Sequence, residues 1–437
     1  MTAANESIPL ARRLGLFDAT MIVMGGIIGA GIFRNPSVVA RVVHTPTQIL
    51  LPWLVGGLIA LAGAFVYAEL ADRKPDVGGQ YAYIRDAFHP MVAFLYGWAL
   101  LLVTQTGGMA AVAMTFAEYF NELTGTAITT QLLAVSTLLI LTAINCLGVR
   151  AGSNVQSTLM VLKILAVAVL VLAGAAAHGA PAPVAYPRGS VSVIALAAAM
   201  VPVLFAYGGW QTASFVSGEI REPRRDLPRA LLIGVLGVVV LYVAVNLVCL
   251  HVLGPDGLAA TATPASEVMR RVLGTTGGRL IAAGIAVSTV GFLSQGMLTA
   301  PRVYFAMARD GVFFRGVGYV SVRSRAPVVA IAVQGVWASV IALSGKYEQI
   351  LNYVVALDAV FFGLTGAALL VFRHRDPKPS GGFRMPGHPW TTLVFVGAFW
   401  ALAVNTVVQN PLSAGIGVLI LLAGIPAYFF WHRQPRG

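Results

Sequence analysis

Long apolar stretches, separated by short polar and basic gaps, run along almost the whole chain. A helix needs about 20 mostly apolar residues to cross a bilayer, and these stretches reach or approach that length. The pattern therefore predicts twelve transmembrane helices, over residues 17–43, 47–71, 91–117, 128–148, 152–176, 191–217, 228–252, 279–306, 327–344, 348–372, 391–410 and 412–431.

The composition agrees with a membrane protein. Apolar residue types make up 57% of the 437 residues and charged types only 11%, about half the charged share of soluble domains. A soluble protein with this composition would lack the polar surface to cover its core. We expect a single integral membrane unit over residues 1–437, all-α, with no soluble domain.

Basic residues fall on alternate sides of these segments in unequal numbers. With both termini in the cytoplasm, 21 of the 29 Lys and Arg residues lie on the inner side, seven lie on the outer side, and Lys163 lies within the fifth segment. The positive-inside rule then predicts a multi-pass protein of the cytoplasmic membrane with both termini inside. A net charge of +12 does not indicate nucleic acid, because the basic residues are scattered between the segments.

Two apolar segments are interrupted near their middles. The first contains "MIVMGGIIGAGIF" (Met21–Phe33), and each glycine weakens a helix by about 1 kcal/mol relative to alanine. The sixth contains "FAYGGWQTASFVSGEI" (Phe205–Ile220), preceded by Pro202. Such breaks at matching places in two halves are typical of inverted-repeat transporters and their binding sites. The alternative is close helix packing, since Gly25 and Gly29 form a GxxxG motif.

Several motifs resemble one family. "GGIIGAGIF" is similar to the first-helix signature of the amino acid–polyamine–organocation (APC) superfamily, in which Ser or Thr commonly stands at the place of Ala30. Four further stretches resemble the L-type amino acid transporter branch of this superfamily: "FAYGGWQTASFVSGEIREPRRDLPRAL", "YAELADRKPDVGGQYAYIRDAF", "RVYFAMARDG" and "FRMPGHPW". The resemblance implies amino acid transport and a LeuT-like fold: a 5+5 inverted repeat (17–176 and 191–372), with helices 1 and 6 broken, plus two additional helices (391–431).

A broken helix offers the groups that an amino acid zwitterion needs. The amides at the start of an outer half-helix suit a carboxylate, and the carbonyls that end an inner half suit an ammonium group. We expect the carboxylate on the backbone amides of Ala30, Gly31 and Ile32. We expect the ammonium group on the carbonyls of Ile27, Ile28, Phe205 and Ala206.

Side chains near the second break would set specificity. By resemblance Phe205 is a gating aromatic, although ordinary packing is its alternative role; Gly208 leaves room, and Gln211 lies just past the break. Gln105 or Met109 of the third segment are weaker candidates. Since none of these residues is acidic, small to medium neutral L-amino acids fit best, with a cationic amino acid or polyamine antiporter as the alternative. Of two acids within the segments, Glu69 is expected to be structural, and Asp358 either functional or bonded to a neighbouring helix.

Lys163 lies 11 residues into its segment, about 17 Å from the inner end. A charge at that depth costs about 3 kcal/mol, which indicates a functional role. The resemblance agrees, because L-type and related bacterial members carry a lysine here, where sodium-coupled relatives of the same fold bind an ion. We expect its ammonium group to hold helix 1 through carbonyls near Gly25 and Gly26, and to contact Ser288 or Thr289. Transport would be sodium-independent, by exchange or by proton coupling through reversible deprotonation.

Other classes of protein lack support in the sequence. There is no H-E-x-x-H, nucleophile elbow or Walker A motif, so we expect neither an enzyme nor an ATP-driven pump, and no cofactor. Two cysteines inside apolar stretches give no metal-ligand spacing. Animal L-type transporters bond a glycoprotein through a cysteine after helix three, and "NELTGTAITT" (Asn121–Thr130) has none. We expect no disulfide-linked subunit, a monomer, and only membrane lipid and the amino acid substrate as partners.

Overall fold

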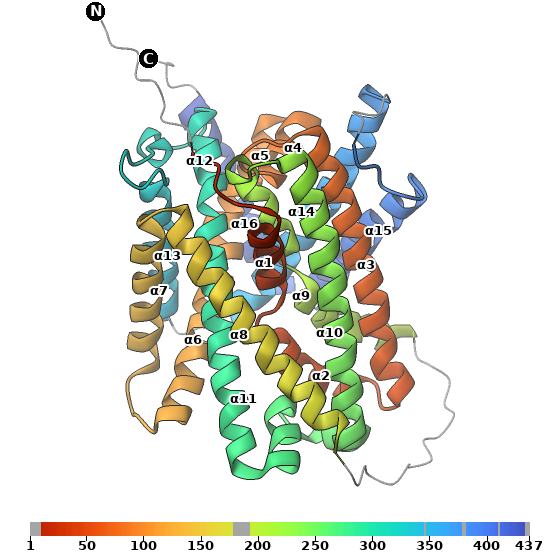
Figure 1. The fold of residues 1–437 in the computed structure, drawn as a ribbon. Helices are drawn as coiled ribbons and strands as arrows, with labels where there is room; N and C mark the ends of the chain where they lie inside the picture. The colour runs from red at the N-terminus through yellow and green to blue at the C-terminus, as the bar shows by residue number, and fades with distance from the viewer. Residues whose placement is uncertain (1–9, 178–192, 345–346, 378–381, 410, 433–437) are drawn as a thin grey trace, which may run out of the picture.

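The chain folds into a bundle of long helices (Figure 1). The computed structural model describes residues 10–177, 193–344, 347–377, 382–409 and 411–432. Within these ranges, nine helical stretches are long and apolar enough to cross a membrane, and three shorter apolar helices, Thr130–Cys146, Val328–Ser344 and Gly415–Trp431, accompany them. The protein is therefore an all-helical membrane protein, as its hydrophobic pattern predicts.

Each of the twelve predicted segments coincides with one helix or with two or three consecutive helices. The elements are α1 (Leu16–Ile27), α2 (Gly31–Val42), α3 (Pro46–Arg73), α4 (Gln80–Ala87), α5 (Pro90–Ala99), η1 (Leu100–Thr104), α6 (Gln105–Thr124), α7 (Thr130–Cys146), α8 (Val149–Ala175), α9 (Val193–Tyr207), η2 (Trp210–Glu219), α10 (Pro223–Ala260), α11 (Pro264–Thr299), α12 (Pro301–Arg309), η3 (Arg315–Gly318), α13 (Val328–Ser344), α14 (Tyr347–Arg375), α15 (Trp390–Gln409) and α16 (Pro411–His432).

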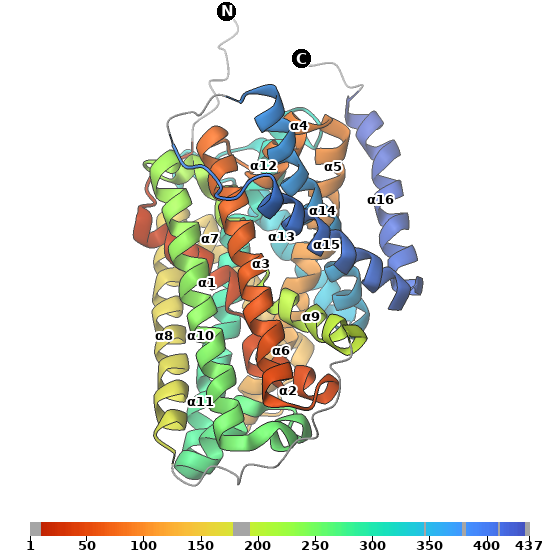
Figure 2. The same ribbon diagram turned by 90° about the vertical axis from the view of Figure 1, so that its right-hand side faces the viewer.

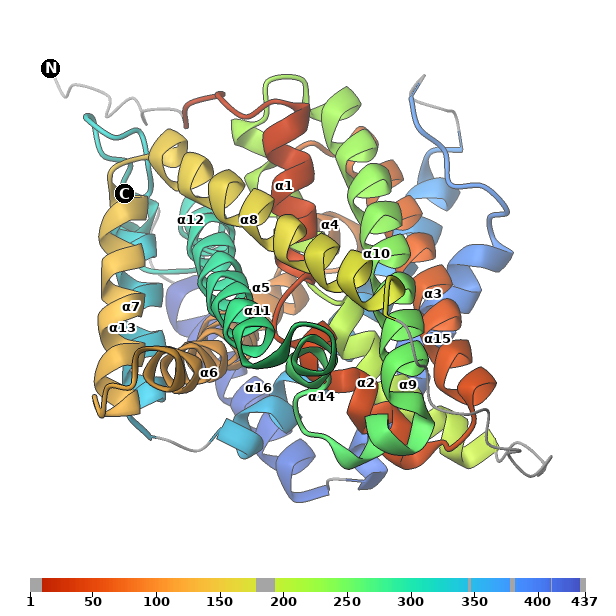
Figure 3. The same cartoon turned by 60° about the horizontal axis from the view of Figure 1, so that its bottom comes forward.

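Helix α1 lies inside the bundle, where it packs against α8, α10, α11 and η2. Figure 3 shows α8 crossing beside α1 and next to α11. Figure 2 shows α16 at the periphery, with α15 between it and α3. The start of α1 and the end of α16 lie at the same end of the bundle (Figure 1), which agrees with an even number of crossings.

Both predicted interruptions are present as breaks in the helices. Helix α1 ends at Ile27 and α2 begins at Gly31, with Ile28 in an extended conformation (φ −75°, ψ 91°). Helix α9 ends at Tyr207, and the chain resumes as the 3₁₀-helix η2 after Gly209, whose φ of 105° favours glycine. The second part of the sixth segment is therefore a 3₁₀-helix, a tighter winding than the α-helix that an apolar run suggests.

Three features depart from the sequence-based boundaries. The third segment contains a π-helical turn, η1, between α5 and α6. Helix α10 continues to Ala260, beyond the predicted end at residue 252, because the chain kinks at Gly254 (φ 67°) and then resumes a helix. Helix α11 begins at Pro264, ahead of the predicted residue 279, and kinks at Gly274 (φ 66°). Glycine makes both kinks possible, since other residues rarely adopt positive φ.

Charged residues tie the segments together at the end where α1 begins. Arg302 of α12 and Glu219 of η2 form a fully buried, two-pronged ion pair, with Nε–Oε1 at 2.7 Å and Nη2–Oε2 at 3.2 Å. The backbone carbonyl of Glu219 accepts from the amides of Arg13 and Leu14 at 2.9 and 3.0 Å. One residue thus holds both α12 and the segment that leads into α1.

Candidate substrate site

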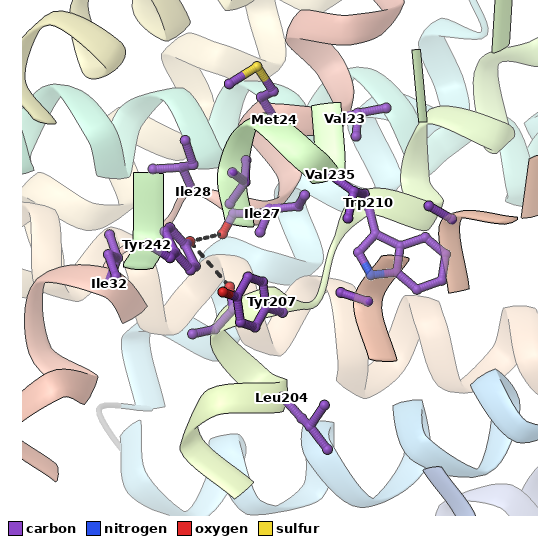
Figure 4. Packing of buried hydrophobic residues seen from close by; sticks show 14 of the residues in the cluster. Val23, Met24, Ile27, Ile28, Ile32, Leu204, Tyr207, Trp210, Val235 and Tyr242 are labelled. Atoms are coloured by element: carbon purple, nitrogen blue, oxygen red, sulfur yellow. Dashed lines mark hydrogen bonds between the residues drawn. The ribbon is translucent and has the colours of Figure 1, made fainter. Parts of the chain in front are cut away.

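The two helix breaks meet through one tyrosine. The hydroxyl of Tyr242, on α10, lies 3.0 Å from the carbonyl oxygen of Ile27 and 3.2 Å from that of Ala206. Figure 4 shows Tyr242 with its hydroxyl directed at these two segments and Tyr207 next to it. Tyr242 is buried and its ring packs against Tyr207 and Trp53. The last turn of α1 and the last turn of α9 are thereby held next to each other.

The amides expected to bind a carboxylate lie together at the start of α2. Ala30 precedes the first residue of this helix, Gly31, and both are partly exposed, whereas Ile32 is buried. Within the described part of the chain, the amides of Ala30, Gly31 and Ile32 donate to no backbone carbonyl. The first amides of a helix have no partner within it, so this half-helix presents three donors and a positive dipole end.

The carbonyls expected to bind an ammonium group already accept hydrogen bonds from the protein. Ile27 and Ala206 accept from Tyr242, Ile28 accepts from Lys163, and Phe205 accepts from the amide of Gly208 at 3.1 Å. A carbonyl oxygen carries two lone pairs, so Ile28, Phe205 and Ala206 each keep one for a ligand, whereas Ile27 also accepts from the amide of Gly29 at 2.9 Å.

Lys163 is fully buried on α8 and reaches the break itself. Its Nζ donates to the carbonyl of Ile28, later in the chain than the expected carbonyls near Gly25 and Gly26. On its other side lies Gly291 of α11, where an added Cβ would stand 3.4 Å from Cε and Nζ. The ammonium group thus lies between α1 and α11.

Gly25 and Gly26 lie in close contact with neighbouring segments. An added Cβ on Gly25 would clash with the amide of Gln156 on α8, and one on Gly26 would clash with the carbonyl of Gly209. Within the described ranges, no hydrogen bond joins Lys163 to either of the expected hydroxyls. Thr289 donates to Ala286 at 2.7 Å, and Ser288 is buried with no hydrogen-bond partner within the described ranges. Gly291 is the α11 residue that adjoins the lysine.

The second break leaves space on one side. Phe205 is 40% exposed, and Gly208, partly exposed, faces only the backbone carbonyls of Phe205 and Leu204 at 3.3 and 3.7 Å. Gln211 is buried, with its Oε1 unpartnered within the part of the chain that the structure describes. The weaker candidates on α6 face elsewhere, because Gln105 and Met109 both pack against Gly296 of α11.

Two residues at the helix breaks could not be predicted from the sequence. Tyr242 lies in an apolar segment without a break, where a tyrosine is usually a packing residue. Phe292 of α11 covers the first break, since its ring would stand 3.4 Å from a Cβ added to Gly29. No motif in the sequence marks either residue; only the arrangement of α10 and α11 against α1 brings them to the breaks.

The two acids within the segments differ in their surroundings. Glu69, near the end of α3, receives hydrogen bonds from Arg73 and Arg373 at 2.9 Å each and from the amide of Met385 at 2.8 Å, which is a structural junction, as expected. Asp358 is partly exposed on α14. Among the described residues, no group of His, Cys, Asp or Glu side chains could hold a metal ion.

Comparison with known proteins places the chain in a family. Residues 14–429 match a family model described as amino acid permease. The chain is 29% identical to the serine/threonine exchanger SteT of Bacillus subtilis (strain 168) over 98% of its own length and 99% of that protein. It is 30% identical to the large neutral amino acids transporter small subunit 2 of Mus musculus (100% and 84%) and 29% identical to the Asc-type amino acid transporter 1 of Mus musculus (99% and 84%).

This family is one of transporters and not of enzymes. The chain therefore belongs to the amino acid permease family of the APC superfamily and is a multi-pass amino acid transporter.

Proposed function

We propose that the protein is a sodium-independent secondary transporter of small to medium neutral L-amino acids, working by exchange or by proton coupling. The observation that carries this proposal is the pair of breaks bridged by Tyr242, with three unpartnered amides at the start of α2. The relatives support the substrate class, since their names specify serine and threonine for one and large neutral amino acids for another.

In the proposed site the substrate binds by its two backbone charges. Its carboxylate accepts from the amides of Ala30, Gly31 and Ile32, and its ammonium group donates to the carbonyls around the two breaks, at Ile27, Ile28, Phe205 and Ala206. Phe205, Gly208 and Gln211 surround the side chain. Lys163 takes the place of a coupling ion by holding the Ile28 carbonyl, with Gly25, Gly26, Ser288 and Thr289 on the surrounding helix faces.

The proposal also covers the repeats of the fold, its orientation in the membrane and its oligomeric state. Residues 17–176 and 191–372 are the two inverted repeats of a LeuT-like fold, and residues 391–431 are two additional helices. Both termini lie in the cytoplasm, on the side rich in arginine. The transporter alternates access to the two sides as a monomer in the membrane lipid, with no disulfide-linked subunit and no cofactor.

Uptake by purified protein in liposomes tests this function. With internal neutral amino acid and no sodium, radiolabelled substrate should enter by counterflow. An inward proton gradient without internal amino acid then separates the two coupling modes, because only a proton symporter would concentrate substrate under it. A requirement for sodium, or no uptake of any amino acid, would refute the proposal.

We predict that the site needs both charges of the zwitterion. Amino acid amides and decarboxylated amines should compete at least tenfold more weakly than the parent amino acid, because an amide offers only a neutral acceptor to the amides at the start of α2 and an amine offers none. The measurement is inhibition of counterflow by each compound. Equal competition by an amine such as cadaverine would favour the polyamine alternative instead.

A further inference from the structure

A basic cleft of about 410 Å³ lies at the end of the bundle where α1 begins. It is formed by three segments that lie far apart in the sequence: the segment before α1, the link between α3 and α4, and the start of α10. The lining residues are Arg12, Pro75, Glu222, Pro223, Arg224 and Arg225. Arginines outnumber acids among them by three to one, so the lining carries a net positive charge.

Two of these arginines have no ion-pair partner. Within the described residues, Arg12 and Arg224 take part in none of the salt bridges, and both side chains are exposed. The third, Arg225, is paired, with its Nη1 at 3.1 Å from Oε2 of Glu222. The planar guanidinium group matches the oxygens of a phosphate group, which it can bind through two parallel hydrogen bonds. The basic cleft therefore offers two guanidinium groups to an anion.

The exposed face of α10 changes from basic to apolar just beyond the cleft. Arg225 and Arg229 are followed on this face by Ile233, Leu236 and Val240, at spacings of three or four residues, and all five are exposed. Figure 2 shows α10 beside α3 on the outside of the bundle, and the two helices pack against each other. An exposed apolar face on a membrane helix contacts acyl chains, so the arginines mark the level of the lipid headgroups.

We propose that the basic cleft binds the phosphate group of an anionic phospholipid from the leaflet at this end of the bundle. The phosphate group lies between Arg12 and Arg224, and the acyl chains run along the apolar face of α10. Basic pockets between membrane helices are typical binding sites for anionic headgroups. The apolar face beside the cleft favours a lipid over a soluble phosphate, because a soluble ion gains nothing from it.

A lipid in the basic cleft holds the start of α1 in place. The amides of Arg13 and Leu14 donate to the carbonyl of Glu219 at 2.9 and 3.0 Å, and the amide of Arg221 donates to the carbonyl of Leu14 at 2.9 Å. These three bonds bring Arg12 to the start of α10. If the segment moved away, the cleft would lose this arginine. A ligand that bridges the two sides therefore favours the arrangement in which the bonds are intact.

Lipid binding to the purified protein, measured by native mass spectrometry, tests the site. Phosphatidylglycerol should bind at least about tenfold more tightly than phosphatidylcholine, and Arg12→Gln and Arg224→Gln should each weaken its binding about fivefold. Arg13→Gln is the matched control, because it removes the same charge from a neighbouring position that does not line the cleft. Glu222→Gln should strengthen binding, since it releases Arg225. All four substituted positions are exposed, so the variants should fold.

Two results would overturn the lipid site. Equal binding of the two lipids, or the same loss in Arg13→Gln as in Arg12→Gln, would mean that the surface charge acts without a specific cleft. Displacement of phosphatidylglycerol by excess inorganic phosphate would instead assign the cleft to a soluble phosphate.

Hydrogen exchange tests the link to α1. In bilayer discs of phosphatidylglycerol, the amides of Arg13, Leu14 and Arg221 should exchange more slowly than in discs of phosphatidylcholine, and Arg224→Gln should abolish this difference. Equal exchange of the unmodified protein in the two lipids would refute the stabilisation of this segment. Neither measurement depends on transport.

Discussion

The burial of Lys163 could be predicted from the sequence, whereas its contacts could not. Its position in the middle of an apolar segment is enough to predict that it faces protein, and it is fully buried. Its partner at Ile28 and its neighbour at Gly291 depend on the rotation of α8 and α11 relative to α1, which no single-sequence pattern contains. Tyr242 is the opposite case, since nothing in its sequence context separates it from a packing tyrosine.

We predict that Lys163→Ala reduces transport at least tenfold while the protein still inserts and folds. Without the ammonium group, the Ile28 carbonyl loses its donor and the break loses its link toward α11. Initial uptake into liposomes and size-exclusion behaviour are the measurements. Leu165→Ala, at a 55% exposed position of the same helix, should transport normally. Normal uptake by the Lys163 variant would contradict this role.

At the scale of elements, the sequence predicts where helices run better than how they wind. Length and apolar content locate all twelve segments, and clustered glycines locate both breaks, because these signals are local. The π-helical turn at Leu100–Thr104 and the 3₁₀ winding of η2 arise from the neighbours against which these segments pack. The pattern does not predict the continuation of α10 past Gly254, because the residues Gly254, Pro255, Asp256 and Gly257 are typical of a turn.

The contact between α1 and η2 yields a second prediction at this scale. Gly26 and Gly209 meet backbone to backbone, so Gly26→Ala should lower stability by about 1–3 kcal/mol, the usual cost of overpacking, and impair transport. Gly15→Ala, where an added Cβ meets nothing within 4 Å, should change stability by less than about 0.5 kcal/mol. Thermal unfolding in detergent measures both. Equal midpoints for the two variants would show that the contact can relax.

Among the described residues, the ion pair of Arg302 with Glu219 holds distant segments together at the end where α1 begins. The paired breaks and this charged end bring together residues that lie far apart in sequence. The hydrophobic pattern predicts the bundle, but it cannot predict which arginine meets which acid, since Arg302 and Glu219 are separated by 83 positions.

We predict that removing one member of the Glu219–Arg302 pair destabilises the protein by about 3–5 kcal/mol, because the other charge stays buried without a partner. Arg302→Met and Glu219→Leu together should recover part of this loss. The comparison is Arg225→Ala, whose exposed pair with Glu222 is worth at most about 1 kcal/mol. Urea unfolding in detergent gives the values, and similar losses for Arg302→Met and Arg225→Ala would contradict the prediction.

The tyrosine that joins the two breaks has a consequence for the empty transporter. A hydroxyl carries one proton, so Tyr242 can satisfy only one of the carbonyls of Ile27 and Ala206 at any moment. Ile27 also accepts from the amide of Gly29 at 2.9 Å, so the carbonyl of Ala206 is the one that loses its donor when the hydroxyl points at Ile27. In the proposed site the substrate's ammonium group supplies that missing donor. Binding of the substrate would thus give every carbonyl at the two breaks a hydrogen-bond donor. In the empty transporter, one carbonyl would remain available to an ammonium group.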